Sequence, residues 1–78
     1  LAAIGVAQMV VLQGRVQRRR EIFEIYTQEL SSIDEVSFMP EIANSYGNRW
    51  LSTVTLDNTK PLKLIEHLSK QNIESRPL

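Results

Sequence analysis

The feature that most constrains this chain is a long opening segment without proline, since the first proline is Pro40. Apolar side chains recur there at steps of three, four and seven, which places them on one face of a helix. The members of this stripe are Leu12, Val16, Phe23, Tyr26 and Leu30, widened by Ile4, Ile22 and Ile33. We therefore predict one helix over residues 1–32, roughly 45 Å long.

A helix of this length is too long for the domain that the chain can form. The chain has 78 residues, and a compact domain of that size has a radius of gyration of about 11–12 Å. The first dozen residues are the end expected to project, because they are apolar on nearly all sides. Even Val10, which points away from the stripe, is apolar. We expect this end to pack against another domain or subunit.

The apolar start suits neither a signal peptide nor a membrane span. A signal peptide needs a basic segment before its apolar run, and a span needs roughly 20 apolar residues. The chain begins at Leu1 without a methionine and stops at Pro77-Leu78 without a polar tail. We therefore expect no membrane partner, and we expect the chain to be a piece of a longer protein.

The remaining residues predict two strands, a helix and a third strand. Val36 and Phe38 indicate a short strand that Pro40 ends, and Trp50 to Leu56 is the strongest strand signal. Thr59 is expected to cap the second helix, with Pro61 in its first turn. Its predicted buried face is Leu62, Leu64, Ile65 and Leu68. Residues 72–76 predict the third strand, so the expected fold is α+β, with both helices on one face of a small antiparallel sheet.

Composition excludes several kinds of site. Nine basic and nine acidic side chains give a net charge of zero, which favours neither nucleic acid nor an acidic membrane. There is no cysteine and His67 is the one histidine, so a metal site is not expected. A lysine that forms a Schiff base needs a lowered pKa, whereas Lys60, Lys63 and Lys70 lie at positions expected to be exposed. The residues alone indicate a non-catalytic α+β module.

Two arginines are candidate ligands for an anion. Arg49 and Arg76 each lie at a strand edge beside a rigid residue, Trp50 or Pro77, and arginine can hold phosphate or carboxylate through two hydrogen bonds. A surface ion pair and a packed tryptophan explain the same pattern, and the residues leave both interpretations open. The run Arg18 to Arg20 points in three directions around a helix, so it is not one patch. Arg19 is expected near the middle of the apolar stripe, in a salt bridge or extending towards water.

Three segments carry a resemblance to a known family. Residues 1–9, followed by Arg15 to Tyr26, resemble the linking helix of sugar aminotransferases of the DegT type. Residues 48–53 and 73–78 resemble the branch that aminates UDP-linked 4-keto-6-deoxy-N-acetylhexosamines for pilin or other surface glycosylation. The resemblance covers essentially the whole chain.

The resemblance implies a fold of the aspartate-aminotransferase type, working as a cytoplasmic homodimer. Its cofactor would be pyridoxal phosphate, and its substrates L-glutamate and a UDP-linked keto sugar. Residues 1–78 would come from the C-terminal small domain, with 1–32 as the linking helix and 33–78 as a small α+β layer. The cofactor lysine and phosphate ligands would precede Leu1, so this piece alone would be inactive. Its expected substrate-binding residues are Arg76, Arg49 and Trp50.

Two further hypotheses come from other functional classes. One is a stand-alone module with a ferredoxin-like sandwich, which would bind a small ligand or serve regulation. The other is a nucleic-acid-binding domain that uses Arg15 to Arg20, although the neutral charge and the lack of aromatic stacking positions argue against it.

Overall fold

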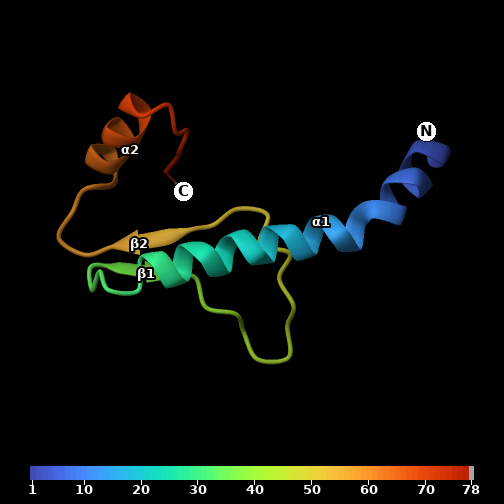
Figure 1. The fold of residues 1–78 in the computed structure, drawn as a ribbon, viewed down its shortest axis with the longest axis horizontal. Helices are drawn as coiled ribbons and strands as arrows, with labels where there is room; N and C mark the ends of the chain where they lie inside the picture. The colour runs from blue at the N-terminus through green and yellow to red at the C-terminus, as the bar shows by residue number, and fades with distance from the viewer. Residues whose placement is uncertain (78) are drawn as a thin grey trace.

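The computed structural model describes residues 1–77, and it contains two helices and two strands. In chain order they are α1 (Ala2–Glu29), β1 (Val36–Phe38), β2 (Val54–Leu56) and α2 (Pro61–Lys70). Figure 1 shows α1 running alongside the two strands, with α2 set apart from α1. The α+β class and the long first helix are therefore confirmed. Leu78, the last residue of the resemblance, lies outside the described residues.

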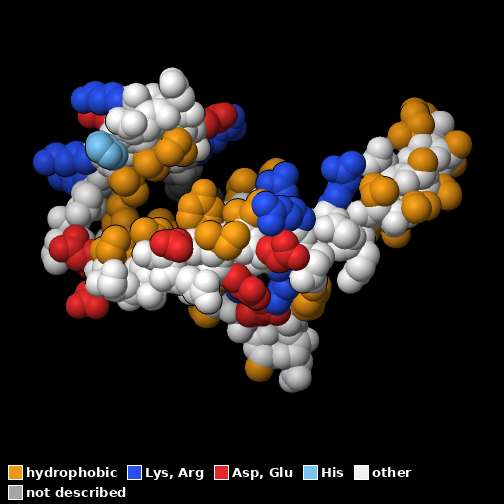
Figure 2. Space-filling view, viewed as in Figure 1, with side chains coloured by type: hydrophobic (Ala, Val, Ile, Leu, Met, Phe, Trp, Pro, Cys, Tyr) orange, Lys and Arg blue, Asp and Glu red, His pale blue; other side chains and the backbone are white. Residues whose placement is uncertain are grey.

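Helix α1 projects well beyond the rest of the chain, as its length predicts. The chain measures 47 Å along its longest axis, and its radius of gyration of 15.6 Å exceeds that of a compact domain of this size. The apolar side chains of the first turns are exposed, with Val10 at 80%, and they cluster at the projecting end in Figure 2. No helix among residues 1–77 is both long and apolar enough to cross a membrane.

The sheet is a single antiparallel pair. Val36 lies opposite Leu56, and Phe38 lies opposite Val54. The strand predicted from Trp50 is therefore shorter than expected, because it begins at Val54. Pro40 cannot donate to a ladder and follows directly on β1 and Met39, so residues 50–53 have no strand to pair with.

Helix α2 begins as predicted with Pro61 in its first turn, but the prediction of Thr59 as its capping residue is wrong. The capping position is Lys60, without a side-chain hydrogen bond, while the Thr59 hydroxyl donates to Glu35 Oε2 over 3.3 Å. Thr59 lies one residue before the capping position, so its hydroxyl is not placed to accept from the second or third N–H of the helix. On the predicted buried face, Leu62 is exposed.

The third strand predicted over residues 72–76 is wrong. Asn72 adopts the left-handed conformation, with φ 61°, and its N–H donates to the carbonyl of Ser69 over 3.0 Å. The N–H of Ile73 donates to the carbonyl of Leu68 over 2.9 Å. These two bonds form a Schellman motif, which ends α2 and reverses the direction of the chain, and no strand follows among the described residues.

The chain has little core of its own. No side chain among the described residues is fully buried, and extensive contact between elements is confined to β1 and β2. The half-buried part of α1 consists of Val16, Arg20, Ile22 and Phe23. This part faces the segment between the strands, which positions the candidate site.

Candidate functional site

The loop of residues 39–53 returns to α1 through Arg49. Its Nη1 donates to the carbonyl of Met39 over 3.0 Å, and its Nη2 lies 3.5 Å from Glu41 Oε2. The guanidinium carbon lies 3.9 Å from the centre of the Phe23 ring, on α1. Phe23 in turn meets Phe38 of β1 edge to face, with ring centres 5.5 Å apart. Arg49 is therefore held on three sides, and its side chain is only 13% exposed.

A second arginine, Arg20, approaches the same loop from α1. Its Nη2 lies 3.1 Å from Glu41 Oε2, the oxygen that also faces Arg49. Its Nη1 donates to the carbonyl of Gly47, and its guanidinium carbon lies 4.0 Å from the centre of the Tyr46 ring. Two guanidinium groups thus share one carboxylate, and each also lies over an aromatic ring. Between them is a small hollow of about 150 Å³, lined by Arg20, Phe23, Glu24 and Arg49.

Arg20, and not Arg19 as predicted, is the arginine of the run that lies against the apolar stripe. Arg20 is half-buried and Arg19 is exposed, and no ion pair of Arg19 occurs in the part of the chain that the structure describes. The reason is helical geometry, because Arg20 follows Val16 by four residues and precedes Phe23 by three. That spacing was the available signal for Arg20, whereas Glu41 and Tyr46 lie in a loop without a periodic pattern.

Trp50 follows Arg49 and is displayed to solvent. Its backbone N–H donates to Asn48 Oδ1 over 3.0 Å, which closes a turn. Arg49 has φ 50°, in the left-handed region, so the chain changes direction directly before the indole. The Trp50 residue is 70% exposed. The alternative of a packed tryptophan does not hold within the described residues, and the indole is available to a ligand or to another part of the protein.

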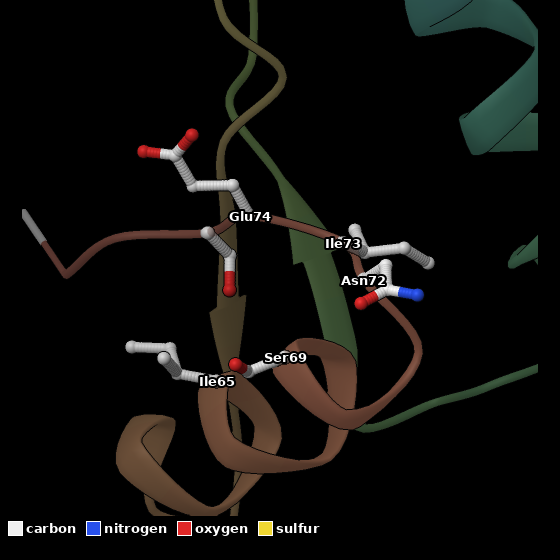
Figure 3. Close-up of a pocket in the computed structure, with 6 residues that line it drawn as sticks. Ile65, Ser69, Asn72, Ile73 and Glu74 are labelled. Carbon is white, nitrogen blue, oxygen red and sulfur yellow. The ribbon is translucent and has the colours of Figure 1, made fainter.

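Arg76 lies on the segment that follows α2. Its Nε and Nη2 donate to Glu74 Oε1 over 3.0 and 2.7 Å, and its side chain is 82% exposed. Next to it is an open hollow of about 350 Å³, lined from α2 by Ile65 and Ser69 and from the following segment by residues 72–75 (Figure 3). The Ser75 hydroxyl is buried and has no hydrogen-bond partner in the described structure. This end of the chain therefore offers an exposed arginine head, paired only with the equally exposed Glu74, and a polar atom without a partner in the described structure.

The three predicted site residues thus fall into two places. Arg49 and Trp50 are neighbours at the junction of α1 with the loop, and Arg76 stands beyond α2. No hydrogen bond or ion pair within residues 1–77 joins Arg76 to either of them. The sequence missed Arg20, Glu41, Phe23 and Tyr46 as members of the junction.

The described residues do not make a site for pyridoxal phosphate. Lys60, Lys63 and Lys70 are all exposed, whereas the lysine that forms a Schiff base must be desolvated or lowered in pKa by neighbouring charge. Both hollows are open. No group of three metal-ligating side chains occurs among residues 1–77. What the geometry offers is anion binding and stacking, through arginine heads and an exposed indole.

Comparisons with known proteins agree over the whole chain. The family model described as the DegT/DnrJ/EryC1/StrS aminotransferase family matches residues 1–78. A Bacillus subtilis (strain 168) protein, "Putative pyridoxal phosphate-dependent aminotransferase EpsN", is 49% identical over 100% of this chain and 20% of its own length. GDP-perosamine synthase of Vibrio cholerae is 33% identical over 97% of this chain and 21% of its own length. The chain thus spans about a fifth of these relatives, and no solved structure matches it.

Proposed function

Because the chain belongs to the DegT/DnrJ/EryC1/StrS aminotransferase family, we propose that it is part of a pyridoxal-phosphate-dependent sugar aminotransferase. The parent protein transfers an amino group from L-glutamate to the ketone of a UDP-linked 4-keto sugar, for glycan or pilin glycosylation. The family match over residues 1–78 is the observation that carries this proposal. The names of the two relatives, an aminotransferase and a synthase of a GDP-linked sugar, support amino transfer and a nucleotide-sugar substrate. The UDP linkage rests on the resemblance of residues 48–53 and 73–78.

The place of this chain in the parent is the C-terminal small domain, with residues 1–32 as the linking helix and 33–78 as the α+β layer. The exposed apolar start of α1 supports this placement, because such a surface needs a partner that residues 1–77 do not supply. We propose that the rest of the parent, in a homodimer, provides that partner. A chain without cysteine suits the cytoplasm, where we place the enzyme.

Within this assembly the described residues bind and orient the nucleotide sugar. Arg76 offers an exposed guanidinium for a phosphate or carboxylate, and Trp50 offers an exposed ring for the base or sugar. Little of the Arg49 side chain is accessible to a substrate, because its N–H groups face the carbonyl of Met39 and the carboxylate of Glu41. We propose that Arg49 contributes to the site indirectly, by holding the loop that carries Trp50. Pyridoxal phosphate, its lysine and the groups that move protons belong to parts of the parent outside these 78 residues.

The test is amino transfer by the full-length parent. The purified enzyme is incubated with L-glutamate and either a UDP-linked or a GDP-linked 4-keto-6-deoxy sugar, and the products are identified by mass spectrometry. We expect an amino sugar and 2-oxoglutarate with the UDP-linked substrate. Product from the GDP-linked substrate alone would contradict the assigned nucleotide, and no amino sugar from either would contradict the proposed reaction.

A further inference from the structure

The loop between the strands is fastened to α1 by a few side chains. Arg20 reaches both Glu41 and the carbonyl of Gly47, which are six residues apart in the loop. Arg49 closes the loop on itself through Met39 and Glu41. Between Met39 and Leu51 only Arg49 is half-buried, so packing alone does not hold this loop in place.

The two fastenings depend on each other. Glu41 Oε2 faces both guanidinium groups, and the side chain of Glu41 is 25% exposed. A carboxylate shared by two arginines in a partly dry place is attracted to both and bridges them. Each arginine also lies on an aromatic ring, Arg20 on Tyr46 from the loop and Arg49 on Phe23 from α1. Loss of either arginine therefore weakens the hold of the other.

The position of Trp50 follows from this arrangement. Arg49 and Trp50 are consecutive, and the left-handed backbone conformation of Arg49 sets the direction in which the chain enters Trp50. The Trp50 residue itself is 70% exposed, so its own contacts do not fix the indole. Its location relative to α1 is set by the groups that hold Arg49.

We infer that Arg20, Glu41 and Arg49 form a latch that positions Trp50 for the nucleotide sugar. Arg20 and Arg49 are then positioning residues, and Trp50 is the residue that meets the ligand. The role for the substrate rests on the proposed function, whereas the hold on the loop rests on the contacts alone.

The experiment uses the full-length parent enzyme and reads two quantities. One is amide hydrogen exchange of Ser45 and Trp50, whose N–H groups donate to the carbonyl of Ile42 and to Asn48 Oδ1, and the other is steady-state kinetics with the nucleotide sugar. Arg20→Ala removes the latch, and Arg19→Ala is the matched control from the same run, because Arg19 is exposed. Tyr46→Phe keeps a ring under Arg20, and Tyr46→Ala removes it.

We expect Arg20→Ala and Tyr46→Ala to speed exchange in the loop and to raise KM about fivefold to thirtyfold, with kcat changed less than about twofold. Arg19→Ala and Tyr46→Phe should match the wild type in both quantities. If the variants instead caused a general structural defect, kcat would fall as well, and Tyr46→Phe would be impaired together with Tyr46→Ala.

Unchanged exchange in Arg20→Ala would overturn the latch. Faster exchange with an unchanged KM would overturn its role in positioning Trp50. If the wild-type enzyme turns over no nucleotide sugar, the proposed function fails and the positioning role fails with it, while the exchange comparison still decides whether the latch exists.

Discussion

The contact between Phe23 and Phe38 is the one aromatic pair that joins α1 to the sheet in the described residues, and its contribution can be measured. The rings meet edge to face at 84° with centres 5.5 Å apart, a geometry worth about 0.5–1.5 kcal/mol beyond burial. Phe23 also lies under Arg49, which adds about 0.5–1 kcal/mol. We therefore expect Phe23→Leu to cost about 1–2.5 kcal/mol and Phe38→Leu to cost less.

The pair is isolated by a double-mutant cycle in the parent enzyme. The local free energy of opening is taken from native-state hydrogen exchange of the amides that join β1 and β2 and of Asp57, whose N–H donates to the carbonyl of Glu35. Phe23→Leu and Phe38→Leu should couple by about 0.5–1.5 kcal/mol, because each removes the same ring contact.

The control uses Tyr26, an exposed aromatic residue on the same helix. Tyr26→Leu combined with Phe38→Leu should be additive. Coupling between positions 23 and 38 no larger than in the Tyr26 control would refute the view that this ring pair fastens α1 to the sheet.

Three further predictions concern Gly14, Asn72 and Arg76. Gly14→Ala should stabilise the protein by about 0.5–1 kcal/mol in denaturant unfolding, because a Cβ there meets nothing within 4 Å; a loss of stability would mean that another part of the parent covers this position. Asn72→Gly should preserve or slightly raise the stability of α2, while Asn72→Val should cost about 1–2 kcal/mol because of its positive φ; equal thermal midpoints for the two variants would contradict the Schellman assignment. Arg76→Ala should raise KM for the nucleotide sugar about tenfold or more, as expected for a lost charged hydrogen bond, whereas Arg18→Ala, which removes the exposed pair with Glu21, should not; unchanged kinetics would remove Arg76 from the site.

Helical periodicity and proline positions predicted much of the fold. The apolar repeat of residues 1–32 predicted α1 and its projection beyond the domain, and both are confirmed. Pro40 and Pro61 correctly bounded β1 and α2. These signals work because they are local, since a missing N–H or a repeat of 3.6 residues acts on the chain wherever it lies.

The predictions that are wrong concern strands, whose formation depends on a neighbouring segment with which to pair. Residues 50–53 have good strand composition, but a strand needs a neighbour, and β1 is only three residues long. Residues 72–76 also suit a strand, yet the left-handed Asn72 ends α2 in a Schellman motif, and no strand forms after it among the described residues. The Schellman motif could have been predicted, because asparagine is second only to glycine in that conformation.

The candidate site shows the same division. Arg49 and Arg76 were predicted as site residues because each lies beside a rigid residue, Trp50 or Pro77, and because of the family resemblance. Contact of Arg49, Trp50 and Arg76 with the substrate stays a prediction. The bridge from Arg20 through Glu41 to Arg49 joins residues 29 positions apart, and no sequence pattern indicates it. Only the folded loop brings them together.

The most direct test of the central claim is the intact mass of the protein isolated from its native source after borohydride reduction, which fixes bound pyridoxal phosphate to its lysine. The account predicts a mass about five times the 8.9 kDa of this chain, since the chain spans 20% of its Bacillus relative, together with one covalently attached cofactor. A native mass of 8.9 kDa without a cofactor adduct would contradict the account and would favour a stand-alone binding module.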